Sequence, residues 1–158
     1  PRLLLPCLGG NERTDSVRAG LVDLLEWSPR KVLIHDAARP FVSTGLINQV
    51  LNELKSYQAV FPVIPVYDAL WKIKESRPER FEITPGPERT NLFRAQTPQG
   101  FIYQDLLTAY KKNTEVKLDD IAIAYENGLS IKGVLGEESN LKVTSEYDLQ
   151  RFLRDKCL

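Results

Sequence analysis

The sequence predicts an α/β fold in which helices flank a mainly parallel sheet. Two apolar runs rich in β-branched residues, at 31–34 and 59–64, indicate buried strands. Between them, residues 45–56 carry leucine, isoleucine and valine at helical spacing. A strand, a helix and a strand over about 30 residues form a βαβ unit, which is expected to be right-handed and to join parallel strands.

The size and composition of the chain limit its function classes. A chain of 158 residues suits one domain, spanning 1–158. Lys plus Arg equals Asp plus Glu at 21 each, so no basic surplus indicates nucleic acid. No apolar run approaches the roughly 20 residues of a membrane span, and no signal peptide is visible. Cys7 and Cys157 match no metal or redox spacing. We expect a cytoplasmic location and neither nucleic-acid nor membrane binding.

The first helix is expected to begin at Asp15 or Ser16, either of which can cap it, and to run to Leu25. Its apolar side consists of Val17, Leu21, Leu24 and Leu25. The loop at Gly9 and Gly10 leads into this helix and offers backbone amides to a base, a sugar or a phosphate. An ordinary loop with a helix cap is the alternative interpretation.

Residues 35–41 (HDAARPF) follow the first strand. Pro40 lacks an amide hydrogen and disfavours a helical conformation at Arg39, so the chain must turn there. Asp36 and Arg39 are therefore expected in a loop at the carboxyl end of a strand, where open α/β sheets bind ligands. Such an acid and arginine can hold a phosphate together with its metal. The alternative is an aspartate that caps the next turn and pairs with Arg39.

The stretch 67–93 departs from the α/β pattern. Residues 71–74 and 80–83 alternate apolar and polar side chains around a polar turn that contains proline. Two such runs predict a β-hairpin. An isolated hairpin is marginal in water, so its apolar side requires a surface to pack on. That side consists of Trp71, Ile73, Phe81 and Ile83.

The last third of the chain returns to helices and strands. Residues 94–101 (RAQTPQGF) are interpreted as a loop because they combine proline, glycine and polar side chains. Helices are expected over about 103–112 and 119–126, and Gly128 can end the second. Asp119 and Asp120 could bind a cation, but adjacent acids at a helix start more often interact with the helix dipole.

A further strand is expected over 130–135, followed by a last helix. Thr144 or Ser145 can cap this helix. We expect Leu149, Phe152 and Leu153 to form its buried side, because they recur at helical spacing.

Four motifs in order carry a resemblance to a known family. They are residues 9–17 (GGNERTDSV), 35–41, 94–101 and 140–144 (NLKVT). Together they resemble the 2-C-methyl-D-erythritol 4-phosphate cytidylyltransferases of non-mevalonate isoprenoid biosynthesis, over nearly all of the chain. The resemblance implies a Rossmann-like nucleotidyltransferase fold. It also implies transfer of CMP from CTP to 2-C-methyl-D-erythritol 4-phosphate, which gives 4-diphosphocytidyl-2-C-methyl-D-erythritol and pyrophosphate with Mg²⁺ or another divalent cation. In some bacteria this domain is fused to the cyclodiphosphate synthase.

The resemblance also implies roles for individual residues. Lys142 would position the polyol phosphate for attack, while Arg89 would grip the same phosphate from the neighbouring subunit of a homodimer joined through the 67–93 arm. His35 is given no catalytic role. Gly10, Asn11 and Ser16 would hold the nucleotide, and Asp36, Arg39 and Thr97 would line the polyol and metal-phosphate region, with Asp36 on the metal.

Three departures from the family pattern weaken this assignment. Ala69 and Leu118 each stand where the family commonly has threonine. The family's usual opening, a strand and a Gly-rich loop with an arginine and a lysine, has no match in the sequence. Because those cations would neutralise the triphosphate, we expect the chain by itself to be inactive.

Two other functions remain open at this stage. The first is the same reaction on ribitol 5-phosphate, although Ala37 and Ala38 favour the methylerythritol enzymes. The second is a non-catalytic nucleotide-binding domain that retains the sheet without the phosphate loop.

Overall fold

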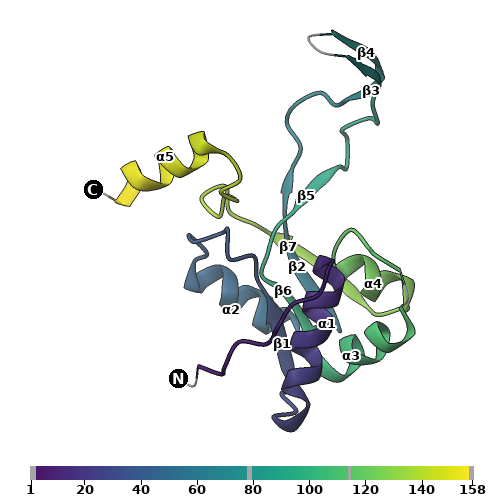
Figure 1. Cartoon of the computed structure of the whole chain (residues 1–158), viewed down its shortest axis with the longest axis vertical. Coiled ribbons are helices and arrows are strands. Elements are labelled where there is room, and N and C mark those ends of the chain that lie inside the picture. Colours follow the sequence, from purple (N-terminus) through teal and green to yellow (C-terminus); the bar gives the residue numbers. More distant parts are fainter. Residues whose placement is uncertain (1–2, 78–79, 114, 157–158) are drawn as a thin grey trace.

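The structure is a computed structural model that describes residues 3–77, 80–113 and 115–156. A five-stranded central sheet forms the body, and a two-stranded hairpin projects from it (Figure 1). No described helix is long and apolar enough to cross a membrane. The central strands are β1 (Lys31–Ile34), β2 (Ala59–Pro65), β5 (Phe93–Ala95), β6 (Gln99–Ile102) and β7 (Ile131–Leu135).

The central sheet is mixed rather than mainly parallel. β1 and β2 run in the same direction, as the βαβ pattern predicts, but β6 lies between them and is antiparallel to both. β5 is also antiparallel to β2, and the one parallel pairing among the described strands joins β2 to β7. The parallel direction of the first two strands is therefore confirmed, whereas the mainly parallel sheet expected from the sequence is wrong.

The interpretation of residues 94–101 as a loop caused this error. β5 and β6 occupy most of that stretch, separated by a short turn that contains a cis Thr97–Pro98 peptide bond. Gln96, Thr97 and Gln99 are buried there, and hydrogen bonds to neighbouring segments satisfy most of their polar groups. Gly100 is required in β6, because a Cβ there would lie 2.5 Å from a methyl carbon of Val50.

Helices cover both faces of this sheet. α2 (Thr44–Glu53) places Val50, together with Leu54 just beyond its end, against Val60 of β2. Ser43 caps α2, because its hydroxyl accepts a hydrogen bond from the Leu46 amide. The opposite face holds the larger core cluster, to which α1 (Arg13–Asp23), α3 (Tyr103–Lys112) and α4 (Asp120–Glu126) contribute.

α1 (Arg13–Asp23) begins earlier than the sequence predicts. Glu12 is the N-cap of this helix, and Asp15 lies in its first turn. The Asp15 carboxylate accepts a hydrogen bond from the Glu12 amide, as in a capping box. A 3₁₀ turn, η1 (Leu24–Glu26), follows the helix. Leu21 is buried as expected, whereas Leu25 is 47% exposed because the tighter turn rotates it off the apolar side.

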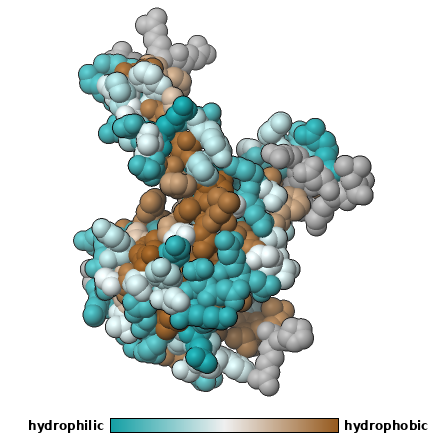
Figure 2. All heavy atoms as spheres, turned by 180° about the vertical axis from the view of Figure 1, so that it is seen from behind, coloured by the Kyte–Doolittle hydropathy of each residue, from teal (hydrophilic) through white to brown (hydrophobic). Residues whose placement is uncertain are grey.

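The predicted hairpin is present as β3 (Trp71–Arg77) and β4 (Arg80–Pro85). Ile73 lies opposite Ile83 and Trp71 opposite Pro85. Its apolar residues do not pack on their own body, since Trp71, Ile73, Phe81 and Ile83 are each more than half exposed. Figure 2 shows apolar surface along the stem of the hairpin and on the adjoining body. The hairpin therefore presents an unpartnered apolar face.

α5 (Glu146–Lys156) extends away from the sheet (Figure 1). Ser145 caps it, because the Asp148 amide donates to the Ser145 hydroxyl and the Asp148 carboxylate accepts hydrogen bonds from the amides of Thr144 and Ser145. The expected buried side is wrong for Leu149 and Leu153, which are 39% and 53% exposed. The side chain of Phe152 lies outside the described residues. Helical spacing predicted the helix correctly but not a surface for it to cover.

Candidate active site

Asp36 is the charge centre of the loop that follows β1. Its Oδ2 lies 3.2 Å from Lys142 Nζ and 3.4 Å from Arg39 Nε. Lys142 comes from the loop after β7, so two segments far apart in sequence meet here. Both loops leave the sheet at the carboxyl ends of their strands, the expected place for a ligand site. Two cations share one carboxylate, which leaves net positive charge for an anion.

Thr97 links this loop to the turn between β5 and β6. Its hydroxyl accepts a hydrogen bond from the Asp36 amide at 3.0 Å and lies 2.9 Å from His35 Nδ1. His35 Nε2 lies 2.9 Å from the Arg39 carbonyl, which can only accept. His35 Nε2 therefore carries the hydrogen, and Nδ1 accepts from Thr97. His35 thus acts as a structural residue at the end of β1, and it ties both ends of the loop together.

A buried polar network holds the Lys142 segment in place. Asn140 is fully buried, and its amide nitrogen donates to the Thr97 carbonyl at 2.8 Å. The backbone carbonyl of Asn140 accepts hydrogen bonds from Arg39 Nη1 at 2.9 Å and from Gln96 Nε2 at 3.2 Å. The Val143 amide donates to the Ala38 carbonyl at 2.8 Å. The residues on both sides of Lys142 are therefore fixed, while its side chain remains 47% exposed.

A cleft of about 300 Å³ brings together four of the predicted site residues. Sequence reasoning missed Arg13, Gln99 and Asp119 in its wall, because each lies in a stretch assigned to a helix start or a loop. A second cleft of about 410 Å³ shares Arg39 and Lys142 with the first. The first cleft is lined by Arg13, Asp36, Arg39, Ala95, Gln96, Thr97, Gln99, Leu118, Asp119 and Lys142.

The residues predicted to hold the nucleotide lie elsewhere. The Gly10 amide donates to the Ser16 hydroxyl at 3.1 Å, and that hydroxyl lies 3.2 Å from the Glu12 carbonyl. Gly10 and Asn11 are exposed, and neither they nor Ser16 line the two clefts around Lys142. Arg13, close to them in the chain, does line the first cleft. This loop therefore lies beside the two clefts, but Gly10, Asn11 and Ser16 do not form part of their walls.

Arg13 forms a two-pronged ion pair with Asp120, which is fully buried. Arg13 Nη1 and Nη2 lie 3.1 and 2.5 Å from the two carboxylate oxygens, and the Tyr110 hydroxyl also donates to Asp120. The hydrogen bond to Asp120 raises the pKa of Arg13. Burial, and then the charge of Asp120, raise the pKa of Tyr110. Of the adjacent acids, Asp119 caps α4 as the sequence predicts, whereas Asp120 holds α1 against α3 and α4.

Arg89 lies in a separate cleft at the base of the hairpin. This cleft, of about 380 Å³, is lined by Arg89 together with Ala69, Trp71 and Pro87, among others. The Arg89 guanidinium donates to the Tyr67 carbonyl. Arg89 lines neither of the clefts that contain Lys142, so one chain does not bring the two predicted catalytic residues together.

Comparison with known proteins finds relatives over most of the chain. The chain is 43% identical over 150 residues to a protein of Paramagnetospirillum magneticum named bifunctional enzyme IspD/IspF, covering 94% of this chain and 38% of that protein. It is 41% identical over 148 residues to a 2-C-methyl-D-erythritol 4-phosphate cytidylyltransferase of Roseobacter denitrificans, covering 94% and 64%. The chain therefore spans less than two thirds of the length of these relatives.

Solved structures show the same fold. The crystal structure of 2-C-methyl-D-erythritol 4-phosphate cytidylyltransferase from Thermus thermophilus superposes with a TM-score of 0.79 at 32% identity, covering 96% of this chain and 72% of that one. The family model described as IspD: 2-C-methyl-D-erythritol 4-phosphate cytidylyltransferase matches residues 5–152. The chain belongs to the 2-C-methyl-D-erythritol 4-phosphate cytidylyltransferase family.

Proposed function

We propose that the protein transfers CMP from CTP to 2-C-methyl-D-erythritol 4-phosphate and releases pyrophosphate. The observation that carries this proposal is that Lys142 and Arg39 both form ion pairs with the Asp36 carboxylate. These three residues line a cleft at the carboxyl edge of the sheet. Family membership supplies the substrate class.

The chemistry suits these residues. A phosphate oxygen of the polyol phosphate attacks the α-phosphorus of CTP, a P–O bond forms, and pyrophosphate leaves with the electron pair of the bond that breaks. The attacking phosphate is already ionised at neutral pH, so no strong general base is needed. The barrier lies in bringing two polyanions together, which preorganised cations lower. Lys142 and Arg39 would supply such charge.

A divalent cation fits the donor set at Asp36. Among the described residues no group of three His, Cys, Asp or Glu side chains could hold a metal by itself. Mg²⁺ commonly uses one or two carboxylates together with substrate phosphates, so Asp36 alone would suffice as the protein ligand. When bound, Mg²⁺ would neutralise charge on the triphosphate.

Arg89 would act in a homodimer. The hairpin exposes Trp71, Ile73, Phe81 and Ile83, and obligate dimers bury faces of this kind. Arg89 sits at the base of that hairpin, away from Lys142 of its own chain. An arm that crosses to a second subunit would bring Arg89 to the partner's polyol phosphate, where a guanidinium can form two parallel hydrogen bonds.

The proposal is tested with the full-length protein, CTP and Mg²⁺. Both 2-C-methyl-D-erythritol 4-phosphate and ribitol 5-phosphate should be offered while pyrophosphate release is measured. We expect higher kcat/KM on the methylerythritol substrate. Faster turnover of ribitol 5-phosphate would replace the assignment with the related reaction, and no turnover of either with nucleotide still bound would favour a non-catalytic domain.

A further inference from the structure

Two buried glutamines line the cleft beside Lys142, and their amides are used differently. The Gln96 amide is fully occupied, since Nε2 donates to the carbonyls of Glu137 and Asn140, and Oε1 accepts from the Glu137 amide at 3.1 Å. Gln96 is therefore a structural residue. Gln99 is equally buried, at 2% exposed, but its amide oxygen has no hydrogen-bond partner among the described residues.

The orientation of the Gln99 amide is fixed by its neighbour. Gln99 Nε2 donates to Asp119 Oδ2 at 3.0 Å, and Asp119 Oδ1 accepts from the Ala122 amide at the start of α4 at 2.9 Å. Because a carboxylate can only accept, the nitrogen of the Gln99 amide must face Asp119. Its oxygen is therefore held as a buried acceptor on a residue that lines the cleft.

A buried acceptor without a donor is unfavourable, because it has lost its hydrogen bond to water. This cost is offset when a ligand brings the donor. An ionised phosphate cannot do so, because it carries few or no hydrogens and the Asp119 carboxylate beside the Gln99 amide disfavours a second anion there. A hydroxyl group can donate to Gln99 Oε1 and carries no charge.

We propose that the Gln99 amide oxygen accepts a hydrogen bond from a hydroxyl group of the polyol phosphate, so that Gln99 is a specificity-determining residue. This inference rests on the proposed function. The polyol is the source of the hydroxyl, rather than the ribose of CTP, because Gln99 shares its cleft with Thr97 and Lys142. None of the residues predicted to hold the nucleotide lines that cleft.

The test pairs a variant with a set of substrates. Gln99→Met has nearly the same shape but neither donates nor accepts. It is compared with the wild type on 2-C-methyl-D-erythritol 4-phosphate and on its three analogues that each lack one hydroxyl group. In the wild type, one analogue should lose about 10- to 100-fold in kcat/KM, the equivalent of the hydrogen bond in question. In Gln99→Met the same analogue and the parent should be used equally well, and KM for CTP should not change.

Two further variants separate recognition from structure. In Asp119→Asn the new amide nitrogen favours the Gln99 oxygen, so the Gln99 amide turns over and presents its nitrogen to the cleft. This variant should also lose the discrimination. Gln58→Met is the matched control, since Gln58 likewise donates its amide to a carboxylate, that of Asp105, but lies outside the cleft. It should retain wild-type discrimination.

Each outcome decides the inference. If Gln99→Met folds and still discriminates against the same analogue as the wild type does, Gln99 does not accept a hydrogen bond from a substrate hydroxyl group. The cytidylyltransferase assignment stands in that case. If the wild type transfers CMP to none of these compounds, the proposed function fails independently of Gln99. Calorimetric titration with the polyol phosphates then examines recognition without turnover. Equal affinity of wild type and Gln99→Met for parent and analogues would overturn the inference in that case as well.

Discussion

The ammonium group of Lys142 lies 3.2 Å from the carboxylate of Asp36, which also lies 3.4 Å from Arg39 Nε. One acid thus orients two cations that arrive from different loops. Since the side chain of Lys142 is half exposed, it can contact a phosphate without leaving Asp36. The site is charged before any ligand enters, which is the condition for electrostatic preorganisation.

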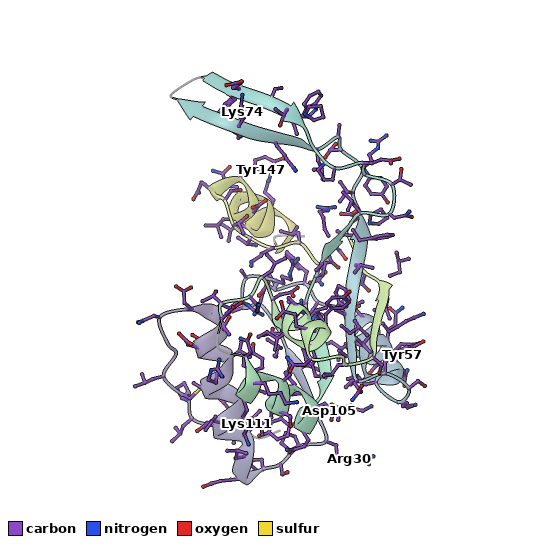
Figure 3. All side chains as sticks on the ribbon, turned by 90° about the vertical axis from the view of Figure 1, so that its right-hand side faces the viewer. Arg30, Tyr57, Lys74, Asp105, Lys111 and Tyr147 are labelled. Atoms are coloured by element: carbon purple, nitrogen blue, oxygen red, sulfur yellow. The ribbon has the colours of Figure 1, made fainter. Side chains whose placement is uncertain are left out.

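Replacing Lys142 with alanine should leave the fold intact, because a half-exposed loop lysine contributes little to packing. It should lower kcat/KM in the full-length protein by on the order of 10²–10³, the usual scale for one preorganised charge contact. Steady-state kinetics and a thermal melt measure both effects. Lys111→Ala is the control, because Lys111 is exposed on α3 (Figure 3) and lines neither cleft around Lys142. Near-normal turnover by Lys142→Ala would remove Lys142 from the mechanism.

Arg89→Ala and Lys142→Ala should rescue each other if the hairpin crosses a dimer. Each variant alone should be nearly inactive. After subunit exchange, a heterodimer would hold one site with both defects and one with neither. Because statistical exchange makes half of the dimers heterodimers, about a quarter of all sites should be active. Mass spectrometry verifies the exchange, and exchanged dimers that stay inactive would refute the crossed arm while leaving the reaction in place.

Arg13→Ala should destabilise the protein by about 3 kcal/mol or more, because removing one partner leaves the fully buried Asp120 carboxylate without its cation. Urea unfolding measures this change. Arg30→Ala is the control, because Arg30 is an exposed arginine outside α1. A loss below about 1 kcal/mol, the range of surface pairs, would mean that the Arg13–Asp120 contact does not hold α1 in place.

Tyr110 should make the protein sensitive to alkali. Burial and the Asp120 charge raise the pKa of Tyr110 in the folded protein, whereas an unfolded tyrosine ionises near pH 10. The contribution of Tyr110 to the free energy of unfolding is therefore complete below about pH 10. It is lost as the pH rises toward the pKa of the folded protein, at about 1.4 kcal/mol per pH unit. In urea titrations between about pH 9.5 and 11.5, Tyr110→Phe should show a shallower decline than the wild type. Identical slopes would contradict this assignment.

Helices and the hairpin could be predicted from the sequence because local patterns determine them. The helix over 103–112 matches α3 residue for residue, since its spacing and its boundaries are local properties. The order of the strands could not be predicted in this way. Placing β6 between β1 and β2 depends on contacts such as Val32 with Phe101, which no local period encodes. The polar character of residues 94–101 also concealed two strands.

Part of the candidate site was likewise visible in the sequence. Asp36 and Arg39 follow a strand and Lys142 precedes a helix, and both positions are typical of ligand sites at the edge of an α/β sheet. Arg13, Gln99 and Asp119 were missed as cleft residues because each reads locally as part of a helix start or a loop. A charge on Arg13 facing a buried Asp120, 107 residues away in the chain, can be seen only when the fold is known.

The position of β6 between β1 and β2 also orders events during synthesis. β1 and β2 are synthesised before residue 99, so the edges of these two strands that pair with β6 stay unpaired while residues 66–98 are added. At about 5–20 residues per second this interval lasts on the order of 2–7 s. The hairpin, whose partners are close in sequence, can form in microseconds within that time. We expect chaperone capture of nascent chains to peak before Ile102 emerges and to fall afterwards, which ribosome profiling of chaperone-bound chains can measure. Release that does not depend on β6 would show that the sheet forms by another order.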